Sequence, residues 1–284
     1  MKDLKEQLSH TLQQDICSIE YYEKGQIGDI YKVDTSDNTY ILKTSEPSTQ
    51  LQTEARMLQD INKYKVSVPK IYDVSQTHLL MEYIESTKIA KCAKEIAAAQ
   101  VLSDLHTVTN DARMYGYYYD TTIATFPQKN EQTQFNWTLF LGQMRIMPMA
   151  KICYDKGHIP QETVGRLEVL CRELYKRIDM ATITPSLLHG DLWSGNILFN
   201  MNGATLIDPA ISFGDKEMDL AYILMFDTFG DTFFESYQEV HPLSEDFYEV
   251  KVPLYQLYPL LVHVALYGGS YVMQLEQLLK RLKV

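Results

Sequence analysis

The sequence predicts an α+β protein of two lobes, a small β-rich lobe over residues 1–84 and a larger, mainly helical lobe over residues 85–284. Three observations predict this arrangement. Short β-rich runs dominate the first third of the chain, and helical patterns dominate from Lys91 onward. The change between the two falls at Met81–Glu85, where we place a hinge. The 284 residues, of which 45% are hydrophobic, are enough for two cores.

The elements of the first lobe follow from periodicity and turn residues. Leu4, Leu8, Leu12 and Ile16 recur at helical spacing in a charged N-terminal stretch. Two β-rich runs flank the turn cluster Ser36-Asp37-Asn38, which predicts an antiparallel hairpin. The elements expected here are that hairpin over residues 25–35 and 38–44, a helix over 51–64, and strands over 68–74 and 78–85.

One carboxylate lies on the apolar face of the predicted helix. Glu54 aligns at helical spacing with Met57 and Ile61. A carboxylate on such a face is costly unless it is paired. Lys43 ends the preceding strand and shares a strand face with Ile41, so one interpretation is a Lys43–Glu54 ion pair that joins strand to helix. The other interpretation is that Glu54 borders the apolar stripe and reaches water.

The second lobe is predicted to be helical with one small hairpin. Two short strands are joined by the turn Met201-Asn202-Gly203. The expected helices cover residues 91–106, 135–157 and 160–180 and the chain from Glu217 onward, and the expected strands cover 197–200 and 204–209.

Charge and cysteine content argue against several classes of partner and site. The net charge of −11 argues against nucleic acid or an anionic membrane as the main partner, because phosphate binding needs a basic surface. The four cysteines form no CxxC pair, so we expect no zinc site, and their scatter fits a cytoplasmic protein. The most apolar long stretch, residues 252–275, contains two prolines, a histidine and two glycines, so we expect buried helices and no membrane span.

The stretch SLLHGDLWSGNILFN, residues 186–200, carries the chemistry. His189-Gly190-Asp191, then Asn196, then Asp208 match the pattern of a phosphotransferase. Asp191 would orient an acceptor hydroxyl and accept its proton, and Asn196 and Asp208 would hold Mg²⁺ at adjacent strand ends. Lys43 would help the ion to stabilise charge on the transferred phosphoryl group. The structural alternative is an N-capping aspartate, a turn asparagine and a strand-end aspartate.

Several longer motifs carry a resemblance to a known family. They are LLHGDLWSGN (187–196), IDPAISFGDKEMDLA (207–221), LYQLYPLLVHVALYGGSY (254–271), FPQKN (126–130) and LLMEYI (79–84). The chain resembles the aminoglycoside-phosphotransferase branch of the protein-kinase-like superfamily, and within it the fructosamine (ketosamine) kinase family. The resemblance covers essentially the whole chain. It implies a two-lobed kinase-like fold, with ATP and Mg²⁺ as cofactors.

The resemblance implies roles for the residues of the phosphotransferase pattern. Asp191 is implied to be the catalytic base, with Asn196 and Asp208 as the residues that hold Mg²⁺. Lys43 is implied to contact the α- and β-phosphates of ATP, and Glu54 to position Lys43.

Adenine and sugar recognition are implied for four further residues. Glu82, Tyr83 and Ile84 are implied to form the hinge that reads adenine through backbone groups. Trp193 is implied to lie against the sugar part of the substrate.

Other parts of the resemblance predict supporting roles or depart from kinases that act on proteins. Asp219 is expected to brace the catalytic loop, His189 to support it, and His263 to be a core histidine with satisfied hydrogen bonds. The loop EKGQIGDIYKV (23–33) has only Gly25 and Gly28, a weak signal for a phosphate-covering loop, and a plain turn is the alternative. The motif IDP and the absence of Ala-Pro-Glu argue against protein hydroxyls as normal substrates.

The function implied is an ATP-dependent kinase of the carbon-3 hydroxyl of ketosamines: fructosamines, ribulosamines or erythrulosamines. Later elimination of the phosphate would free the amine, so the kinase would act in deglycation. The partner would be a small-molecule ketosamine or a glycated protein lysine. One alternative is a small-molecule kinase of the choline or aminoglycoside type, against which Trp193 and the C-terminal motif count. The other is a non-catalytic nucleotide-binding regulator, against which the presence of the base Asp191 counts.

Overall fold

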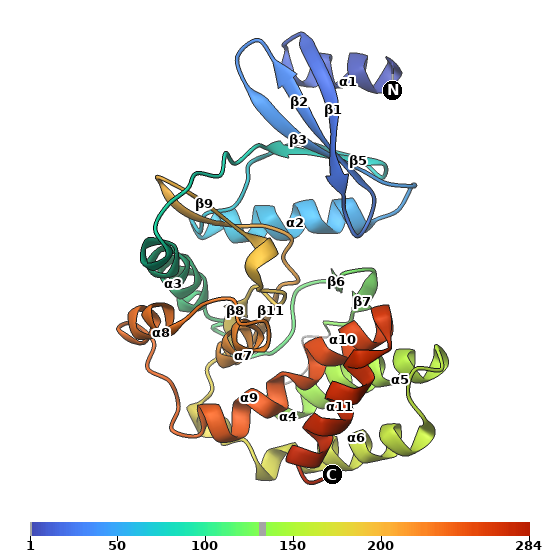
Figure 1. Ribbon diagram of the computed structural model, residues 1–284, viewed down its shortest axis with the longest axis vertical. Helices are drawn as coiled ribbons and strands as arrows, with labels where there is room; N and C mark the ends of the chain where they lie inside the picture. The colour runs from blue at the N-terminus through green and yellow to red at the C-terminus, as the bar shows by residue number, and fades with distance from the viewer. Residues whose placement is uncertain (1, 131–134) are drawn as a thin grey trace.

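The computed structural model describes residues 2–130 and 135–284 and has two lobes stacked end to end (Figure 1). The smaller lobe is a β-sheet with two helices, and the larger lobe is mainly helical. Helix α1 lies at the far end of the smaller lobe, and the C-terminus lies at the far end of the larger one (Figure 1). The predicted α+β fold with two lobes is confirmed.

Five antiparallel strands form the sheet of the smaller lobe, in the order β1-β2-β3-β5-β4. Alternate residues of a strand face opposite sides of a sheet. Leu80 accordingly packs on one side with Leu8 of α1, and its neighbour Leu79 packs on the other side with Leu51 of α2. The elements of this lobe are α1 (Lys2–Leu12), β1 (Ile16–Lys24), β2 (Asp29–Thr35), β3 (Thr39–Thr44), α2 (Gln50–Lys63), β4 (Ile71–Val74) and β5 (His78–Glu82).

One prediction for this lobe needs correction, and one strand was missed. The helical spacing that included Ile16 is wrong there, because α1 ends at Leu12 and Ile16 begins β1. Strand β1 was not expected, since most of its residues are exposed and it lacks a regular alternation. The hairpin of β2 and β3 is confirmed, and its turn is closed by the Thr35 N–H, which donates to the Asn38 carbonyl at 2.9 Å.

The larger lobe contains the helices expected from Lys91 onward, with shifted ends. Helix α4 begins after Asn136, whose side-chain oxygen accepts the Leu139 N–H at 3.1 Å, so Phe135 lies outside it. The elements are α3 (Lys91–Thr107), α4 (Trp137–Phe140), η1 (Leu141–Ile146), α5 (Met147–Asp155), α6 (Gln161–Glu173), η2 (Leu174–Lys176), η3 (Met180–Thr182), η4 (Ser194–Asn196), α7 (Glu217–Met225), α8 (Asp231–Gln238), η5 (Phe247–Lys251), α9 (Val252–Tyr255), α10 (Leu257–Tyr267) and α11 (Ser270–Arg281).

The described part of the larger lobe contains three two-stranded ribbons. The predicted hairpin is present as β9 and β10, and the other two ribbons were not predicted because each strand has only three residues. The ribbons are β6 (Thr121–Ile123) with β7 (Phe126–Gln128), β8 (Ser186–Leu188) with β11 (Ser212–Gly214), and β9 (Ile197–Asn200) with β10 (Gly203–Leu206). The β8–β11 and β9–β10 ribbons bring the HGD motif and the IDP motif into the same region.

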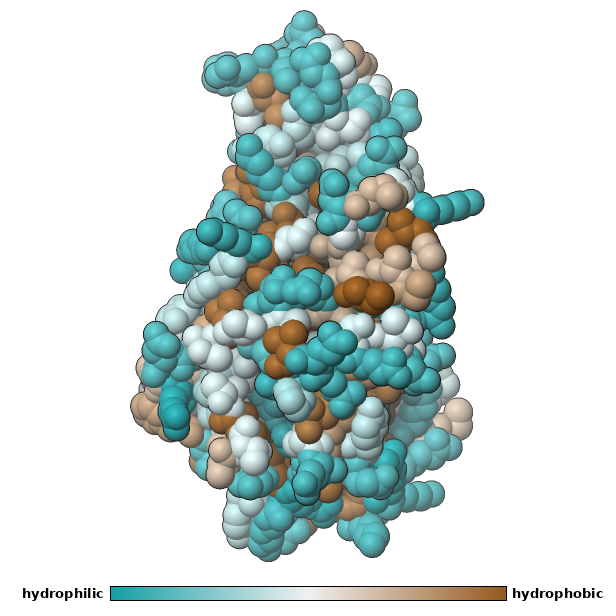
Figure 2. Space-filling view, turned by 90° about the vertical axis from the view of Figure 1, so that its left-hand side faces the viewer, coloured by the Kyte–Doolittle hydropathy of each residue, from teal (hydrophilic) through white to brown (hydrophobic). Residues whose placement is uncertain are grey.

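The two lobes meet around α2 and the segment after β5. Residues 83–90 connect β5 to α3, and the predicted division between residues 84 and 85 lies within this connection. Figure 2 shows the side that carries α3 and α8: hydrophilic residues cover most of both ends, and hydrophobic ones are more frequent at mid-height. Within the described residues, no helix combines the length and the hydropathy needed to cross a bilayer.

Candidate active site

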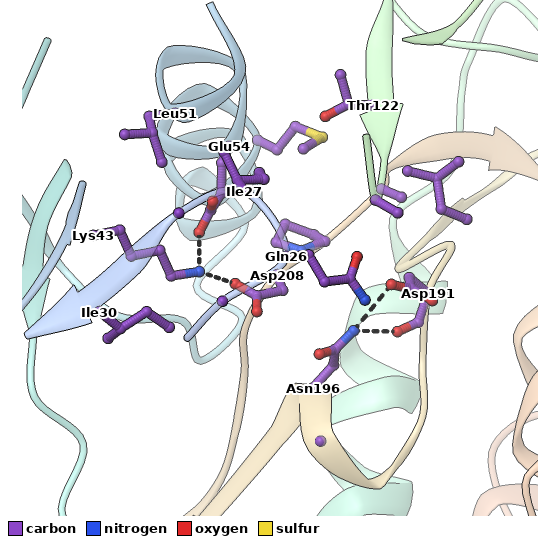
Figure 3. Close-up of a pocket in the computed structure, with 18 of the residues that line it drawn as sticks. Gln26, Ile27, Ile30, Lys43, Leu51, Glu54, Thr122, Asp191, Asn196 and Asp208 are labelled. Atoms are coloured by element: carbon purple, nitrogen blue, oxygen red, sulfur yellow. Dashed lines mark hydrogen bonds and ion pairs between the residues drawn. The ribbon is translucent and has the colours of Figure 1, made fainter. Parts of the chain in front are cut away.

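A cavity of about 350 Å³ lies between the lobes. Residues from the β1–β2 turn, β3, α2, the β6–β7 hairpin and the two predicted motifs line it. Most of its polar groups are labelled in Figure 3. The predicted site residues found in its lining are Lys43, Glu54, Asp191, Trp193, Asn196 and Asp208.

A buried carboxylate holds the loop that carries Asp191. The two oxygens of Asp219 accept the backbone N–H groups of His189 (2.7 Å) and Gly190 (2.9 Å). Asp219 is fully buried, and His106 Nε2 also donates to it at 3.1 Å. Burial alone would raise the pKa of Asp219, but the hydrogen bond and charge of His106 hold it below its ordinary value. Asp219 therefore braces the loop from behind, as expected.

Local geometry explains why the motif reads His-Gly-Asp. Gly190 has φ +82°, and a Cβ there would overlap the carbonyl oxygen of Ala210, so glycine is required. His189 is fully buried, and its Nε2 donates to the carbonyl of Ile207 at 3.0 Å. Burial lowers the pKa of His189, which favours the neutral ring. His189 thus ties the HGD loop to the segment that carries Asp208, a supporting role.

Asp191 and Asn196 are joined directly. Asn196 Nδ2 donates to the Asp191 carbonyl (2.7 Å) and to Asp191 Oδ2 (3.2 Å), which leaves the amide oxygen of Asn196 for another partner (Figure 3). Burial raises the pKa of Asp191 to about 7, and the nearby charge of Asp208 acts in the same direction. A carboxylate with this pKa is well matched to accept a proton near neutral pH.

Asp208 meets an ion pair that comes from the other lobe. It has φ +52°, in the left-handed region that residues other than glycine seldom adopt, and such strain is common at functional sites. Its side chain accepts from Lys43 Nζ, which also donates to Glu54 Oε1 at 2.7 Å. The predicted Lys43–Glu54 pair is therefore present, and Lys43 lies on the α2 side of the sheet together with Ile41.

One lysine shared by two carboxylates explains the ionisation of this cluster. Burial would lower the pKa of Lys43, but Asp208 and Glu54 raise it above its ordinary value, so Lys43 stays charged. Burial would raise the pKa of Asp208, but the Lys43 charge holds it below its ordinary value. Burial raises the pKa of Glu54, and the nearby charge of Asp208 acts in the same direction, against the charge of Lys43. Asp208 is thus the carboxylate that stays ionised most easily.

The donors around the cavity fit a Mg²⁺ ion that is carried by a nucleotide. Within residues 2–130 and 135–284, no group of three or more His, Cys, Asp or Glu side chains is arranged to hold a metal by itself. Asn196 and Asp208 offer one amide and one carboxylate oxygen, both hard ligands, at the open end of the β9–β10 hairpin, where the start of β9 pairs with the end of β10. Mg²⁺ is commonly held by one or two carboxylates together with phosphate oxygens and water.

The glycine loop and Trp193 both line the cavity, the loop from the smaller lobe and Trp193 from the larger lobe. Residues 25–28 form a tight turn in which the Gly25 N–H donates to the Gly28 carbonyl at 2.8 Å. A Cβ on Gly28 would overlap the Thr44 carbonyl oxygen, so only glycine lets this turn lie against β3 at the cavity. Trp193 is 37% exposed, and its ring packs over Gly195 at the edge of the same cavity.

The predicted hinge residues lie outside this lining. Glu82 and Tyr83 line a second, more open hollow together with Tyr40, and the described lining of the first cavity does not include Ile84. The Glu82 N–H already donates to the Lys70 carbonyl at 2.8 Å. Adenine recognition through the backbone of these residues stays a prediction.

The expectation for His263 is only partly right. Its Nδ1 hydrogen-bonds to the Pro259 carbonyl at 2.8 Å, so that nitrogen is satisfied. The residue is half-buried, not part of the core, and its ring packs among Phe226, Tyr267 and Tyr271. It does not contribute to the described lining of the cavity.

Sequence reasoning missed two groups near the site. Thr122, Ile123 and Ala124, near the turn of the β6–β7 hairpin, line the cavity that Asp191 and Trp193 also line. This hairpin turns at Ala124, which has φ +50°, without the glycine or asparagine that would signal it. Behind the loop, Lys251 is buried and bonded to Asp215 (2.9 Å) and Glu217 (2.6 Å). The signal for this cluster was the charged GDKEMD run.

Comparison with known proteins identifies the family. The family model described as fructosamine kinase matches residues 1–284. The chain belongs to the fructosamine kinase family. A protein of Enterococcus faecium named as a probable ketoamine kinase is 32% identical over 264 residues, which cover 90% of this chain and 92% of that protein. The solved structure of a fructosamine-3-kinase candidate from Thermobifida fusca has a TM-score of 0.89 at 25% identity, with all of both chains covered.

More distant structures support the fold alone. The gentamicin complex of the aminoglycoside phosphotransferase APH(2")-IIa has a TM-score of 0.66 at 18% identity and covers 100% of this chain and 95% of that one. The kinase-like architecture predicted from the motifs is therefore confirmed for this fructosamine kinase family member.

Proposed function

We propose that this protein is an ATP-dependent kinase that phosphorylates the carbon-3 hydroxyl of ketosamines and thereby starts their deglycation. The observation that carries the proposal is the convergence of Lys43, Asp191, Asn196 and Asp208 on one cavity between the lobes. Membership of the fructosamine kinase family supports the substrate class.

The base in this reaction is Asp191. It accepts the proton of the carbon-3 hydroxyl as that oxygen forms a bond to the γ-phosphorus of ATP, and the bond from that phosphorus to ADP breaks. Asn196 orients Asp191 through its Nδ2 donor, and Asp219 fixes the loop through two backbone N–H groups. The reaction depends on positioning and charge stabilisation, because the protein forms no covalent intermediate.

The remaining residues bind the nucleotide and the sugar. Lys43, positioned by Glu54, contacts the α- and β-phosphates. Asn196 and Asp208 would hold Mg²⁺, which when bound neutralises phosphate charge. Glu82, Tyr83 and Ile84 form the adenine hinge through backbone groups, and Trp193 lies against the sugar.

The product explains the biological purpose of such a kinase. A phosphate on carbon 3 lies next to the carbonyl carbon of the ketosamine. Loss of a carbon-1 proton gives an enaminol, which expels phosphate from carbon 3 and forms an iminium ion. Water hydrolyses the iminium ion, and the free amine and a dicarbonyl sugar result. The amine can belong to a small molecule or to a protein lysine.

ADP release with four acceptors tests the proposal. The purified protein is incubated with Mg-ATP and fructosyl-lysine, ribulosyl-lysine, choline or kanamycin, with an acceptor-free reaction as control. We expect ADP release above the control with at least one of the two ketosamines. Release with choline or kanamycin alone would support the alternative small-molecule kinase. Nucleotide binding without release in any reaction would support a non-catalytic regulator.

A further inference from the structure

Helix α2 belongs to the cores of both lobes. Leu51 and Ala55, in its first half, pack with Leu79 and Met81 of the sheet. Met57 and Ile61, in its second half, belong to the core of the larger lobe. In Figure 1 the helix lies directly between the sheet and the larger lobe. Glu54 therefore lies on a helix that is held by both lobes.

One carboxylate fixes the second half of α2 to the larger lobe. Asp60 is buried, and its Oδ2 accepts hydrogen bonds from the hydroxyls of Tyr119 (2.7 Å) and Tyr117 (3.2 Å). Its Oδ1 accepts from Lys63 at 2.5 Å. The guanidinium of Arg56, one turn earlier on α2, lies 3.6 Å from the centre of the Tyr119 ring. Two residues of α2 therefore hold the same tyrosine.

Tyr119 leads directly into the hairpin that lines the cavity. It precedes β6 by two residues, α2 packs against β6, and the hairpin tip contributes Thr122 and Ala124 to the lining. The base of the hairpin is also fixed. Asn130 Nδ2 donates to the Tyr119 carbonyl (3.1 Å), and its Oδ1 accepts from the buried Arg145 (2.5 Å). The hairpin thus forms part of the cavity lining and contacts α2 directly.

The two ends of α2 therefore reach different parts of one site. Glu54 holds Lys43 on the nucleotide side. Asp60 holds Tyr119, which leads into the hairpin that lines the cavity together with Asp191 and Trp193. The two carboxylates are six positions apart on one helix, which connects the hairpin to the Lys43–Glu54 pair.

We propose that Asp60 is a positioning residue that couples ketosamine binding at the β6–β7 hairpin to nucleotide binding at the Lys43–Glu54 pair. The ketosamine part of this inference rests on the proposed function. The sugar orders the hairpin, Tyr119 and Asp60 pass this order to α2, and the nucleotide then binds more tightly. By linkage, the nucleotide tightens ketosamine binding by the same factor.

Calorimetry with two ligands tests the coupling. The affinity for a non-hydrolysable ATP analogue with Mg²⁺ is measured with and without saturating fructosyl-lysine. In the unmodified protein we expect the sugar to tighten analogue binding by about tenfold. Tyr119→Phe removes only the hydroxyl that donates a hydrogen bond to Asp60, and Asp60→Ala removes the carboxylate that accepts it. Both should reduce the factor to about twofold or less. Asp60→Asn, which keeps one acceptor oxygen, should restore part of it.

Tyr118→Phe is the matched control. It is the same chemical change one position away, at a side chain that is 62% exposed and packs on Phe213. It should leave the coupling factor unchanged, and melting temperatures of all variants show whether they are folded. An unchanged factor in folded Tyr119→Phe, an equal loss in Tyr118→Phe, or no coupling in the unmodified protein would overturn the inference.

A separate measurement distinguishes this failure from failure of the proposed function. If the unmodified protein neither binds nor phosphorylates ketosamines, the substrate assignment is wrong. Binding of the ATP analogue without sugar then still tests the role of Asp60. The affinity for the analogue should fall by about threefold in Tyr119→Phe but not in Tyr118→Phe. Equal affinity in the two variants would overturn the positioning role.

Discussion

Replacement of Asp191 by asparagine should lower turnover by about a thousandfold while the protein stays folded and binds nucleotide. Asparagine has the same shape, and its Oδ1 can still accept the hydrogen bond from Asn196 that the carboxylate accepts at 3.2 Å. The loop keeps the backbone bonds to Asp219. Only the ability to accept a proton is lost, so the change acts on the transition state.

The size and sign of the effects follow from the environment of Asp191. Its pKa of about 7 is close to the optimum for a general base at neutral pH, so loss of the base should lower kcat by about a thousandfold, or ~4 kcal/mol. The unfolded-state pKa of an aspartate is about 3.9. Between about pH 3.9 and about pH 7, Asp191 therefore binds a proton in the folded protein that it has lost in the unfolded chain. The ionised carboxylate therefore destabilises the fold above pH 7, and Asp191→Asn should melt at the same or a higher temperature at about pH 8.

The assay is a coupled measurement of ADP release over a range of pH, together with calorimetry of nucleotide binding. In the unmodified protein kcat/KM, which reports the free enzyme, should fall about tenfold per pH unit below pH 7, because the base becomes protonated. Nucleotide affinity should be similar in Asp191→Asn. A variant with near-normal kcat, or a kcat/KM profile that stays flat well below pH 7, would refute the assignment of Asp191 as the base.

Three further substitutions test other parts of the site. Asp208→Ala should raise the Mg²⁺ concentration needed for nucleotide binding by about tenfold or more; an unchanged magnesium titration would remove Asp208 from the metal site. Trp193→Ala should raise KM for the ketosamine by about tenfold with little change in KM for ATP, because the exposed ring supplies stacking area; equal changes in both constants would argue against a sugar contact. Gly190→Ala should destabilise the protein by about 3 kcal/mol or more, since φ is +82° and the Cβ meets the Ala210 carbonyl; a melting temperature within error of the unmodified protein would contradict this.

Much of the fold could be predicted because long amphipathic segments carry their own periodicity. Helix α2 is one example, since the apolar spacing of Met57 and Ile61 located it to within one residue. Strand β1 could not be found in this way, because it is an edge strand whose residues are mostly exposed. The ribbons of three-residue strands were missed for a different reason: they are held by contacts with distant segments, such as the bond from Leu187 N–H to Val108.

In the candidate site, too, residues in local sequence patterns could be predicted, and residues held by long-range contacts could not. The local motif located Asp191, Asn196 and Asp208, because the chemistry requires these residue types at short spacing. The Lys43–Glu54 pair could be proposed from a carboxylate on an apolar helix face. The hairpin wall and its link to Asp60 could not be predicted, because those contacts join residues that are 57 and 59 positions apart in the sequence.

The position of the new phosphate tests the central claim most directly. Fructosyl-lysine labelled with ¹³C in the sugar is incubated with the protein and Mg-ATP, and the product is followed by phosphorus and carbon NMR. We predict coupling of the new phosphate to carbon 3, followed by loss of that signal as free lysine is released. A phosphate on any other carbon, or consumption of ATP without a phosphorylated sugar, would contradict the account.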